Sequence, residues 1–259
     1  MILHQTMYPT TAYFKNKIIL ITGSARGIGH HLALEFGKLQ ATIIVNFSKS
    51  KTEALNTVTK IEQNGGKAII IKANVSKIQD VKSMCRQIIK KCGRVDILIN
   101  NAGAVFEDMD WTKHDHKNWD KTIAVNLTGV FNCILAVAPI MIKQKSGKIL
   151  NISSLRSILG ATDIIAYAAA KAGVNNLTKS YAKILSPYIN VNSLVLGKIN
   201  YGINQITDQK TTKKLFANNL MKRLGNQDDV FNATSFLTSF QSDFITGQTL
   251  VVDGGASLI

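Results

Sequence analysis

The stretch Lys17-Ile18-Ile19-Leu20-Ile21-Thr22-Gly23-Ser24-Ala25-Arg26-Gly27-Ile28-Gly29 decides the fold of this chain. Its first six residues are an apolar run rich in isoleucine, which is typical of a buried parallel strand. The glycines follow as Gly-x-x-x-Gly-x-Gly, and a helical pattern continues through Leu39. Glycines between a strand and a helix let phosphates approach free backbone N–H groups at the positive end of the helix dipole. The segment therefore predicts a nucleotide-binding turn, with an ordinary turn as the alternative.

Six further strand-like segments alternate with amphipathic stretches, at 41–47, 67–73, 95–99, 147–153, 189–195 and 248–252. This alternation predicts an α/β fold: a single-domain, Rossmann-like, doubly wound parallel sheet of about seven strands with helices on both faces. Ligands of such sheets bind at the carboxyl ends of the strands. Because Gly23, Asn101 and Ser154 each follow a strand, we expect them to meet in one crevice.

The length of 259 residues, 46% of them hydrophobic, suits one large core, and we assign residues 16–259 to a single catalytic domain. Residues 1–15 are expected to form a flexible arm, and Met7 is an alternative start. We predict neither a secretory signal nor a membrane-spanning run. The three cysteines, Cys85, Cys92 and Cys133, fit no metal or redox pattern, so we expect reduced thiols and a cytoplasmic location.

Tyr167 and Lys171 are four residues apart in Tyr167-Ala168-Ala169-Ala170-Lys171, and Ser154 precedes the tyrosine by thirteen positions. On a helix this spacing places the phenol and the ammonium on one face. A nearby cation lowers the pKa of a tyrosine, and a pKa close to the working pH favours acid–base catalysis. The alternative is an ordinary helix with a buried tyrosine and a solvated lysine.

Two further motifs are rich in amides. The strand at 95–99 runs into Asn100-Asn101-Ala102-Gly103, where small residues would let a flat ligand lie against the backbone. Asn126 stands in a largely apolar helical stretch, where an unpaired amide costs roughly 1–3 kcal/mol. A packing or helix-bending amide is the alternative for Asn126.

In this order the motifs resemble those of the short-chain dehydrogenase/reductase family. Thr22-Gly23-x-x-x-Gly27-x-Gly29 looks like its cofactor motif, and Asn100–Gly103 looks like its structural motif. The likeness continues through Ile189–Asn192 to Ile245–Gln248 and Asp253–Gly255, so it covers roughly residues 16–259. Within the family, the chain looks most like the 3-oxoacyl-[acyl-carrier-protein] reductase and acetoacetyl-CoA reductase branch, while sugar and steroid dehydrogenases share the same frame.

The resemblance implies a catalytic tetrad of Asn126, Ser154, Tyr167 and Lys171 and the reduction of a ketone, most like a 3-oxoacyl thioester. Tyr167 would give its proton to the carbonyl oxygen and Ser154 would hydrogen-bond that oxygen. Lys171 would lower the pKa of the phenol and hold the nicotinamide ribose, and Asn126 would fix a relaying water. A dinucleotide-sensing or scaffold protein of low activity remains an alternative.

The end of the second strand favours NADP(H) as the cofactor. NAD sites usually place a carboxylate there, whereas Val45-Asn46-Phe47-Ser48-Lys49 has none. Arg26 and Lys49 would instead neutralise a 2′-phosphate, with help from Ser48. The predicted cofactor contacts are Gly23, Ser24, Arg26, Gly27, Ile28, Gly29, Ser48, Lys49, Asn74, Val75, Asn101, Ala102, Gly103, Tyr167, Lys171, Gly197 and Ile199.

The chain departs from the family after the sixth strand. Leu196-Gly197 replaces the usual Pro-Gly, and Tyr201 stands where relatives carry a threonine that contacts the carboxamide. We expect residues 200–222 to form a flap over the substrate.

The formal net charge of +15 is compatible with an acidic acyl carrier protein or with coenzyme A, although scattered lysines favour a solvated basic surface. The clusters at 143–145 and 210–214 are too short to indicate nucleic-acid binding. His114-Asp115-His116 indicates a polar loop, so we predict no metal site. The family resemblance implies a homotetramer built on the helices around 116–143 and 164–186, with a second interface at the C-terminal strand and Ala256–Ile259.

Overall fold

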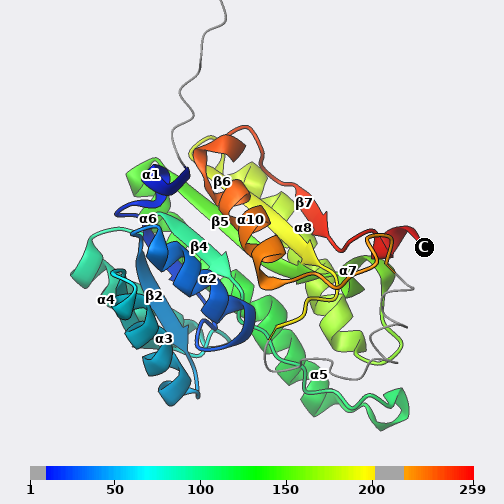
Figure 1. The fold of residues 1–259 in the computed structure, drawn as a ribbon. Helices are drawn as coiled ribbons and strands as arrows, with labels where there is room; N and C mark the ends of the chain where they lie inside the picture. The colour runs from blue at the N-terminus through cyan, green and yellow to red at the C-terminus, as the bar shows by residue number, and fades with distance from the viewer. Residues whose placement is uncertain (1–9, 202–218) are drawn as a thin grey trace, which may run out of the picture.

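A computed structural model describes residues 10–201 and 219–259 of the chain. Seven strands form one parallel sheet in the order β3-β2-β1-β4-β5-β6-β7 (Figure 1). The direction of winding reverses between β1 and β4, which makes the carboxyl ends of these two strands the expected ligand crevice. The strands are β1 (Ile18–Ile21), β2 (Thr42–Phe47), β3 (Lys67–Lys72), β4 (Ile97–Asn100), β5 (Gly147–Ser154), β6 (Ile189–Leu196) and β7 (Thr249–Val252).

Helices cover both faces of the sheet, which confirms the predicted doubly wound fold. One face packs against α2 (Gly27–Lys38), α3 (Lys51–Gln63) and α10 (Gln227–Thr238). The other packs against α4 (Ile78–Cys92), α6 (Gly129–Gln144) and α8 (Ile165–Leu185). Figure 1 shows α2 and α10 on one side of the strands and α8 on the other. Shorter helices are α5 (His116–Ile123) and α7 (Arg156–Leu159).

Burial on both faces explains why β1 is a continuous apolar run rather than an alternating one. Ile19 and Ile21 point into the core beneath α2, and Ile18 and Leu20 point into the core on the opposite side. A parallel sheet covered on both sides requires this pattern. The predicted strand bounds agree with the structure to within two residues.

The expected flexible arm over residues 1–15 is wrong for its last residues. Residues Thr10–Phe14 form the short helix α1, and the Phe14 side chain is completely buried. Its ring contacts Phe36 edge-on at 5.0 Å between centroids. Aromatic burial of this size ties the segment to the core beneath α2. Residues 1–9 lie outside the described part of the chain.

Residues His116–Gln144 form one continuous helical stretch, α5, a π turn at Ala124–Thr128, and α6. Within the described residues, it is the one helix long and apolar enough to cross a membrane, by length and composition alone. Half of its most apolar window is buried inside this fold, where Val130, Ile134 and Val137 pack against the sheet. Packing in the core thus accounts for part of its apolar character. The stretch is longer and more apolar than the prediction of no membrane-spanning run allowed.

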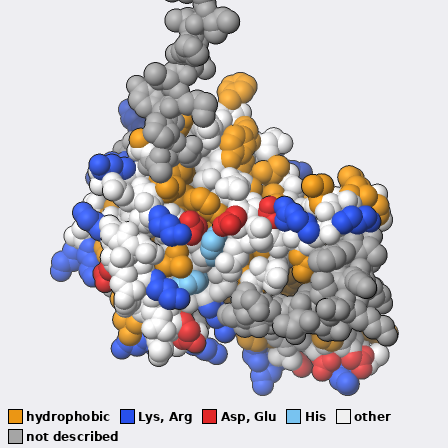
Figure 2. Space-filling view, viewed as in Figure 1, with side chains coloured by type: hydrophobic (Ala, Val, Ile, Leu, Met, Phe, Trp, Pro, Cys, Tyr) orange, Lys and Arg blue, Asp and Glu red, His pale blue; other side chains and the backbone are white. Residues whose placement is uncertain are grey.

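The cationic side chains on the visible surface are scattered rather than clustered (Figure 2). Figure 2 shows Lys and Arg side chains scattered over the visible face, with no single basic patch. Hydrophobic side chains gather instead beside β7 and the C-terminus (Figure 2), where Leu250, Val251, Leu258 and Ile259 are exposed. Exposed apolar groups that lie together, rather than singly, mark surfaces that associate.

Candidate active site

The carboxyl ends of β1 and β4 are joined by a small network centred on Thr22. Its hydroxyl oxygen accepts the backbone N–H groups of Asn101 (2.9 Å) and Ala102 (3.0 Å), and the Asn101 amide donates to the Thr22 carbonyl (2.9 Å). Gly23 follows with φ of +63°, and a Cβ there would stand 2.9 Å from Ala102 Cα. Only glycine fits such a left-handed and crowded position. The structure therefore brings the first two predicted motifs together where the ligand crevice is expected.

Helix α2 begins in this crevice with an open N-terminus. Arg26 occupies the N-cap position in an extended conformation, and no side chain of the described residues caps the helix. The first N–H groups of a helix have no partner within it, so those of Gly27, Ile28 and Gly29 need an outside acceptor. A glycine-rich, uncapped N-terminus beside an arginine is suited to a nucleotide phosphate. The residues present thus fit a dinucleotide.

Ser24 shapes this turn from inside. Its hydroxyl donates to the Ile21 carbonyl (2.8 Å) and accepts the Asn46 N–H (3.1 Å), and its own N–H donates to the Asn46 carbonyl (3.0 Å). The Asn46 side chain in turn accepts the Gly23 N–H (3.1 Å). Ser24 therefore offers no free donor to a phosphate, unlike the role expected for it. Asn46 was missed, although a lone amide in the apolar strand Thr42–Phe47 was a signal.

Several other predicted cofactor contacts follow the carboxyl ends of β2 and β3 or flank the glycine turn. Ser48 and Lys49 are exposed directly after β2, and Arg26 is exposed and pairs with no carboxylate among the described residues. Asn74, after β3, uses its side-chain oxygen to order its own loop. Val75 is buried.

Asn126 lies completely buried in the π turn between α5 and α6. Its amide nitrogen donates to the carbonyls of Ala104 (2.6 Å) and Thr122 (2.8 Å), and its oxygen accepts the Ala104 N–H (3.3 Å). A π turn inside an α-helix is frequently found at a functional site. Asn126 is therefore a packing amide, which was the alternative stated for it. Its bonds to Ala104 also hold the loop after β4.

Lys171 projects from α8 into the same region and is 3% exposed. Its ammonium group donates to the Ile152 carbonyl at 2.7 Å. A Cβ added at Gly103 would stand 2.9 Å from the Asn126 oxygen and 4.0 Å from Lys171 Nζ, so both side chains converge beneath that glycine. The alternative of a solvated lysine is wrong.

Tyr167 lies one turn earlier on α8, and Lys171 Nζ is 5.6 Å from the centre of its ring. Burial raises the pKa of the Tyr167 phenol above its usual value, and a hydrogen bond with Ser154 opposes that rise. Burial also lowers the pKa of Lys171 to about 8. The expectation that the lysine makes the phenol acidic is therefore not met, because loss of hydration outweighs the hydrogen bond with Ser154.

One residue of this region was not predicted, and another was noted only as a departure from the family. Glu107, in the loop after β4, accepts the backbone N–H groups of Ala166 and Tyr167 at the start of α8. The ring of Tyr201 lies over the glycine turn, because a Cβ at Gly27 would stand 3.5 Å from two of its carbons. The tyrosine at the position where relatives carry a threonine thus places an aromatic ring beside the glycine turn.

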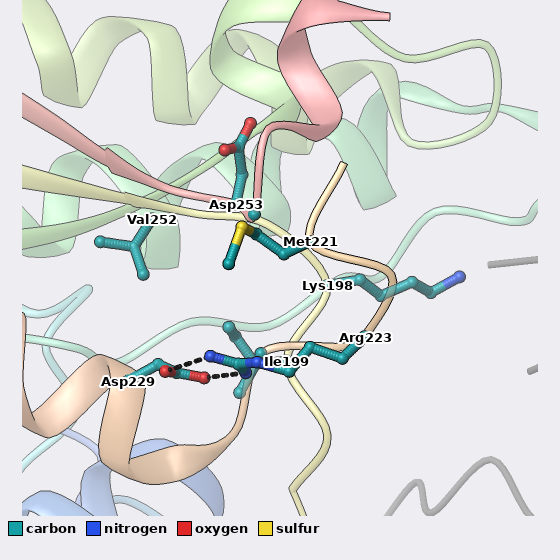
Figure 3. A pocket seen from close by; sticks show the side chains of 9 residues that line it. Lys198, Ile199, Met221, Arg223, Asp229, Val252 and Asp253 are labelled. Carbon is teal, nitrogen blue, oxygen red and sulfur yellow. Dashed lines mark hydrogen bonds and ion pairs between the residues drawn. The ribbon is translucent and has the colours of Figure 1, made fainter. Parts of the chain in front are cut away.

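The segments that flank residues 202–218 are anchored to the C-terminal turn. A cavity of ≈ 80 Å³ is lined in part by Lys198, Ile199, Met221 and Asp253. Arg223 and Asp229 also line it, and Figure 3 shows them paired with each other. None of the predicted tetrad lines this cavity, which is too small for a dinucleotide. Most of the predicted flap over 200–222 lies outside the described residues, so only its two ends are placed.

Comparison with known proteins agrees with this geometry. The family model for short chain dehydrogenase matches residues 17–212. A 3-oxoacyl-[acyl-carrier-protein] reductase of Staphylococcus epidermidis is 37% identical over 241 residues, which cover 93% of this chain and 98% of the relative. The chain belongs to the short-chain dehydrogenase/reductase family. It is an oxidoreductase, and members of this family work with a nicotinamide dinucleotide.

Other relatives show how widely the frame is shared. A 3-oxoacyl-[acyl-carrier-protein] reductase of Synechocystis is 37% identical, with 92% of this chain and 96% of the relative covered. A solved gluconate 5-dehydrogenase of Burkholderia cenocepacia, in complex with NADP and tartrate, superposes with a TM-score of 0.88 at 33% identity, over 96% of this chain and 99% of that one. The family is therefore established, whereas the substrate requires a separate argument.

Proposed function

We propose that this oxidoreductase reduces the ketone of a 3-oxoacyl thioester, linked to acyl carrier protein or to CoA, with NADPH. The observation that carries the proposal is the convergence of Asn126, Ser154, Tyr167 and Lys171 beside the open N-terminus of α2. The reductases of Staphylococcus epidermidis and Synechocystis, each 37% identical over nearly their whole length, support the choice of substrate.

NADPH is favoured over NADH by the charges at the crevice. The bound cofactor supplies the hydride that reaches the carbonyl carbon. Arg26 and Lys49 are exposed cations at the ends of the glycine turn and of β2, where no carboxylate would repel a 2′-phosphate. The NADP in the gluconate 5-dehydrogenase structure is consistent with this choice.

Tyr167 donates the proton that the reduced carbonyl oxygen requires. The raised pKa of the partly buried phenol keeps it protonated, as a proton donor must be. Ser154 accepts the Arg156 N–H through its oxygen (3.3 Å) and is hydrogen-bonded to the Tyr167 phenol, so its O–H must turn from the phenol to donate to the substrate oxygen. Lys171 stabilises the phenolate that remains, and with Asn126 it supplies the route by which the phenol regains its proton.

The decisive experiment measures NADPH oxidation with acetoacetyl-CoA. We expect Tyr167→Phe to lower turnover by about 10³-fold while NADPH binding is retained, since only the donated proton is lost. A phenylalanine variant with near-native turnover would reject the assignment. Wild-type protein that binds NADPH but oxidises none with any ketone would favour the dinucleotide-sensing alternative.

A panel of ketones separates the remaining substrates. The likeness to a gluconate 5-dehydrogenase keeps sugar derivatives as an alternative, and steroids complete the panel. We expect kcat/KM to be largest for the 3-oxoacyl thioesters. A larger value for a sugar acid would replace the proposed substrate without changing the assigned proton donor.

We also propose a cytoplasmic homotetramer. A shallow groove between the π turn and α8, lined by Leu127, Phe131 and Leu177, lies on the helical face expected to meet a second copy. Phe131 and Leu135 are 40% and 46% exposed, although they belong to an apolar helix. The apolar group beside β7 would form the second interface. Sedimentation of the wild type and of Phe131→Glu tests this arrangement: we expect the variant to dissociate.

An acidic acyl carrier protein is the macromolecular partner that the charge of +15 would attract. The scattered lysines of Figure 2 would raise its rate of association more than they would define one docking patch. We expect kcat/KM for an acyl-carrier-protein substrate to fall steeply with salt, and the value for the CoA substrate to fall less.

A further inference from the structure

The first turn of α8 is held by a carboxylate from a distant part of the chain. Its N-cap residue, Ile164, has no polar side chain, and the first turn contains no acidic residue. Glu107 takes over that function: one of its oxygens accepts the Ala166 N–H (2.6 Å), and the other accepts the Tyr167 N–H (3.0 Å). Both N–H groups belong to the set that a helix cannot satisfy itself.

This cap differs from the other caps in what it connects. Asp115 caps α5 by accepting the Asn118 N–H, three residues away. Such a local cap fixes a helix only to the segment that directly precedes it. Glu107 is 59 residues from Ala166, so it fixes α8 to the loop that follows β4. Through Ala104 the same loop holds Asn126.

The capped residues are the ones on which the chemistry depends. Tyr167 is itself one of the two donors, so the Glu107 carboxylate fixes the position of the Tyr167 backbone relative to the loop after β4. Bonds from N–H groups to a carboxylate are charge-assisted and stronger than neutral ones. A displacement of about 1 Å in a reacting group can lower a rate by roughly 100-fold.

We propose that Glu107 is a positioning residue for Tyr167, which it holds in register with Asn126 by joining the start of α8 to the loop after β4. The inference rests on the proposed role of Tyr167 as the proton donor. Among the described residues, the Glu107 carboxylate accepts its hydrogen bonds from the backbone N–H groups of Ala166 and Tyr167, so we assign it an action through the tyrosine and not on the substrate.

The test compares Glu107→Gln with the matched cap variant Asn226→Ala, which removes the cap of α10. Glutamine keeps the size of the side chain but has only one oxygen, so one N–H loses its acceptor. We expect Glu107→Gln to lower kcat about tenfold, with NADPH affinity changed by less than about twofold. Amide hydrogen exchange at Ala166 and Tyr167 should quicken. Asn226→Ala should lose similar stability with kcat unchanged.

A Glu107→Gln variant with native kcat, or one whose kcat falls no further than that of Asn226→Ala, overturns the inference. If a larger truncation such as Glu107→Ala fails to fold, the glutamine variant still decides. Tyr167→Phe in the same assay separates the two proposals. If the phenylalanine variant stays active, the proton donor is wrong; if it is inactive while Glu107→Gln is normal, only the positioning role is wrong.

Discussion

Helices α2 and α8 both begin at the carboxyl edge of the sheet, and their first turns are built in opposite ways. At α2 the first turn holds glycines and follows Arg26, with no capping side chain among the described residues. At α8 the first turn is closed by both oxygens of Glu107. The first N–H groups of α2 are left for a ligand, as we propose, whereas those of α8 bond to the Glu107 carboxylate.

The difference follows from what each helix end must do. An open N-terminus carries unpaired N–H donors and a partial positive charge. This arrangement is stabilised when an anion binds there. A closed N-terminus satisfies its donors within the protein and so holds its residues in one place. On this proposal, the N-terminus of α2 binds the cofactor and the N-terminus of α8 positions Tyr167.

The largest effect is expected at the open end, from Gly29→Ala. The added Cβ would clash with the Asn101 amide and stand 2.7 Å from the Gly23 carbonyl oxygen. Relief of this overlap must move the turn that faces the phosphates. Overpacking of this kind costs about 3 kcal/mol, so NADPH should bind roughly 100-fold more weakly. Fluorescence titration with NADPH measures the change.

Gly37→Ala in the same helix is the matched control. A Cβ at Gly37 would meet the Ile61 side chain at 2.9 Å, so this position is also crowded, although less severely than Gly29, and by a side chain of α3 rather than by the glycine turn. NADPH affinity should be unchanged in this variant. Equal losses of affinity in both variants would mean that general damage to α2, not the geometry of the turn, controls binding.

The next effect concerns the closed end, where Lys171 is buried one turn beyond Tyr167. Its folded-state pKa is about 8, and its usual value is 10.5. Between these values the unfolded chain keeps a proton that the folded chain has lost, so stability rises with pH through this window. Relative to Lys171→Met, the wild type should gain on the order of 2 kcal/mol between pH 8 and 10.5.

Urea unfolding of the cofactor-free proteins across this pH range measures the difference, and the other lysines and tyrosines cancel in the comparison. Parallel pH profiles for the wild type and the methionine variant would show that Lys171 titrates as it does in water. That result would contradict its burial beneath Gly103.

A smaller effect is expected from Arg26→Ala, again at the open end. Loss of one charge-assisted contact to a 2′-phosphate should weaken NADPH binding about tenfold and leave NADH nearly unaffected. Competition titrations with the two cofactors give the ratio. Lys60→Ala, on the exposed face of α3, controls for the general loss of positive charge. Equal weakening for both cofactors would remove Arg26 from the 2′-phosphate site.

The fold could be predicted because its signals are local. The run Lys17–Thr22 is apolar at every position except its ends, and glycines follow it at once, so strand, turn and helix N-terminus are readable without any distant contact. The short helix α1 was not readable, because it depends on Phe14 packing against Phe36, which lies in another element.

The site could be predicted as a set of side chains but not as an arrangement. The spacing of Tyr167 and Lys171 reveals a shared helix face, yet the pKa of each depends on burial that only the fold creates. No sequence pattern connects Glu107 to Ala166, since the loop and the helix meet only in three dimensions. For the same reason, Ser24 was predicted as a cofactor contact although its hydroxyl already bonds to Ile21 and Asn46 inside the turn.

Ser24→Ala therefore gives the smallest effect and the sharpest test of how the open end is built. The variant loses the hydrogen bonds of the buried hydroxyl to Ile21 and Asn46, which should lower the free energy of unfolding by about 1 kcal/mol. NADPH affinity should change by less than about twofold, because the N–H groups that await the phosphates belong to Gly27–Gly29. Urea unfolding and NADPH titration on the same preparation measure both quantities. A large loss of affinity with little loss of stability would mean that the hydroxyl turns outward to the cofactor, and that the open end includes a side chain as well as backbone.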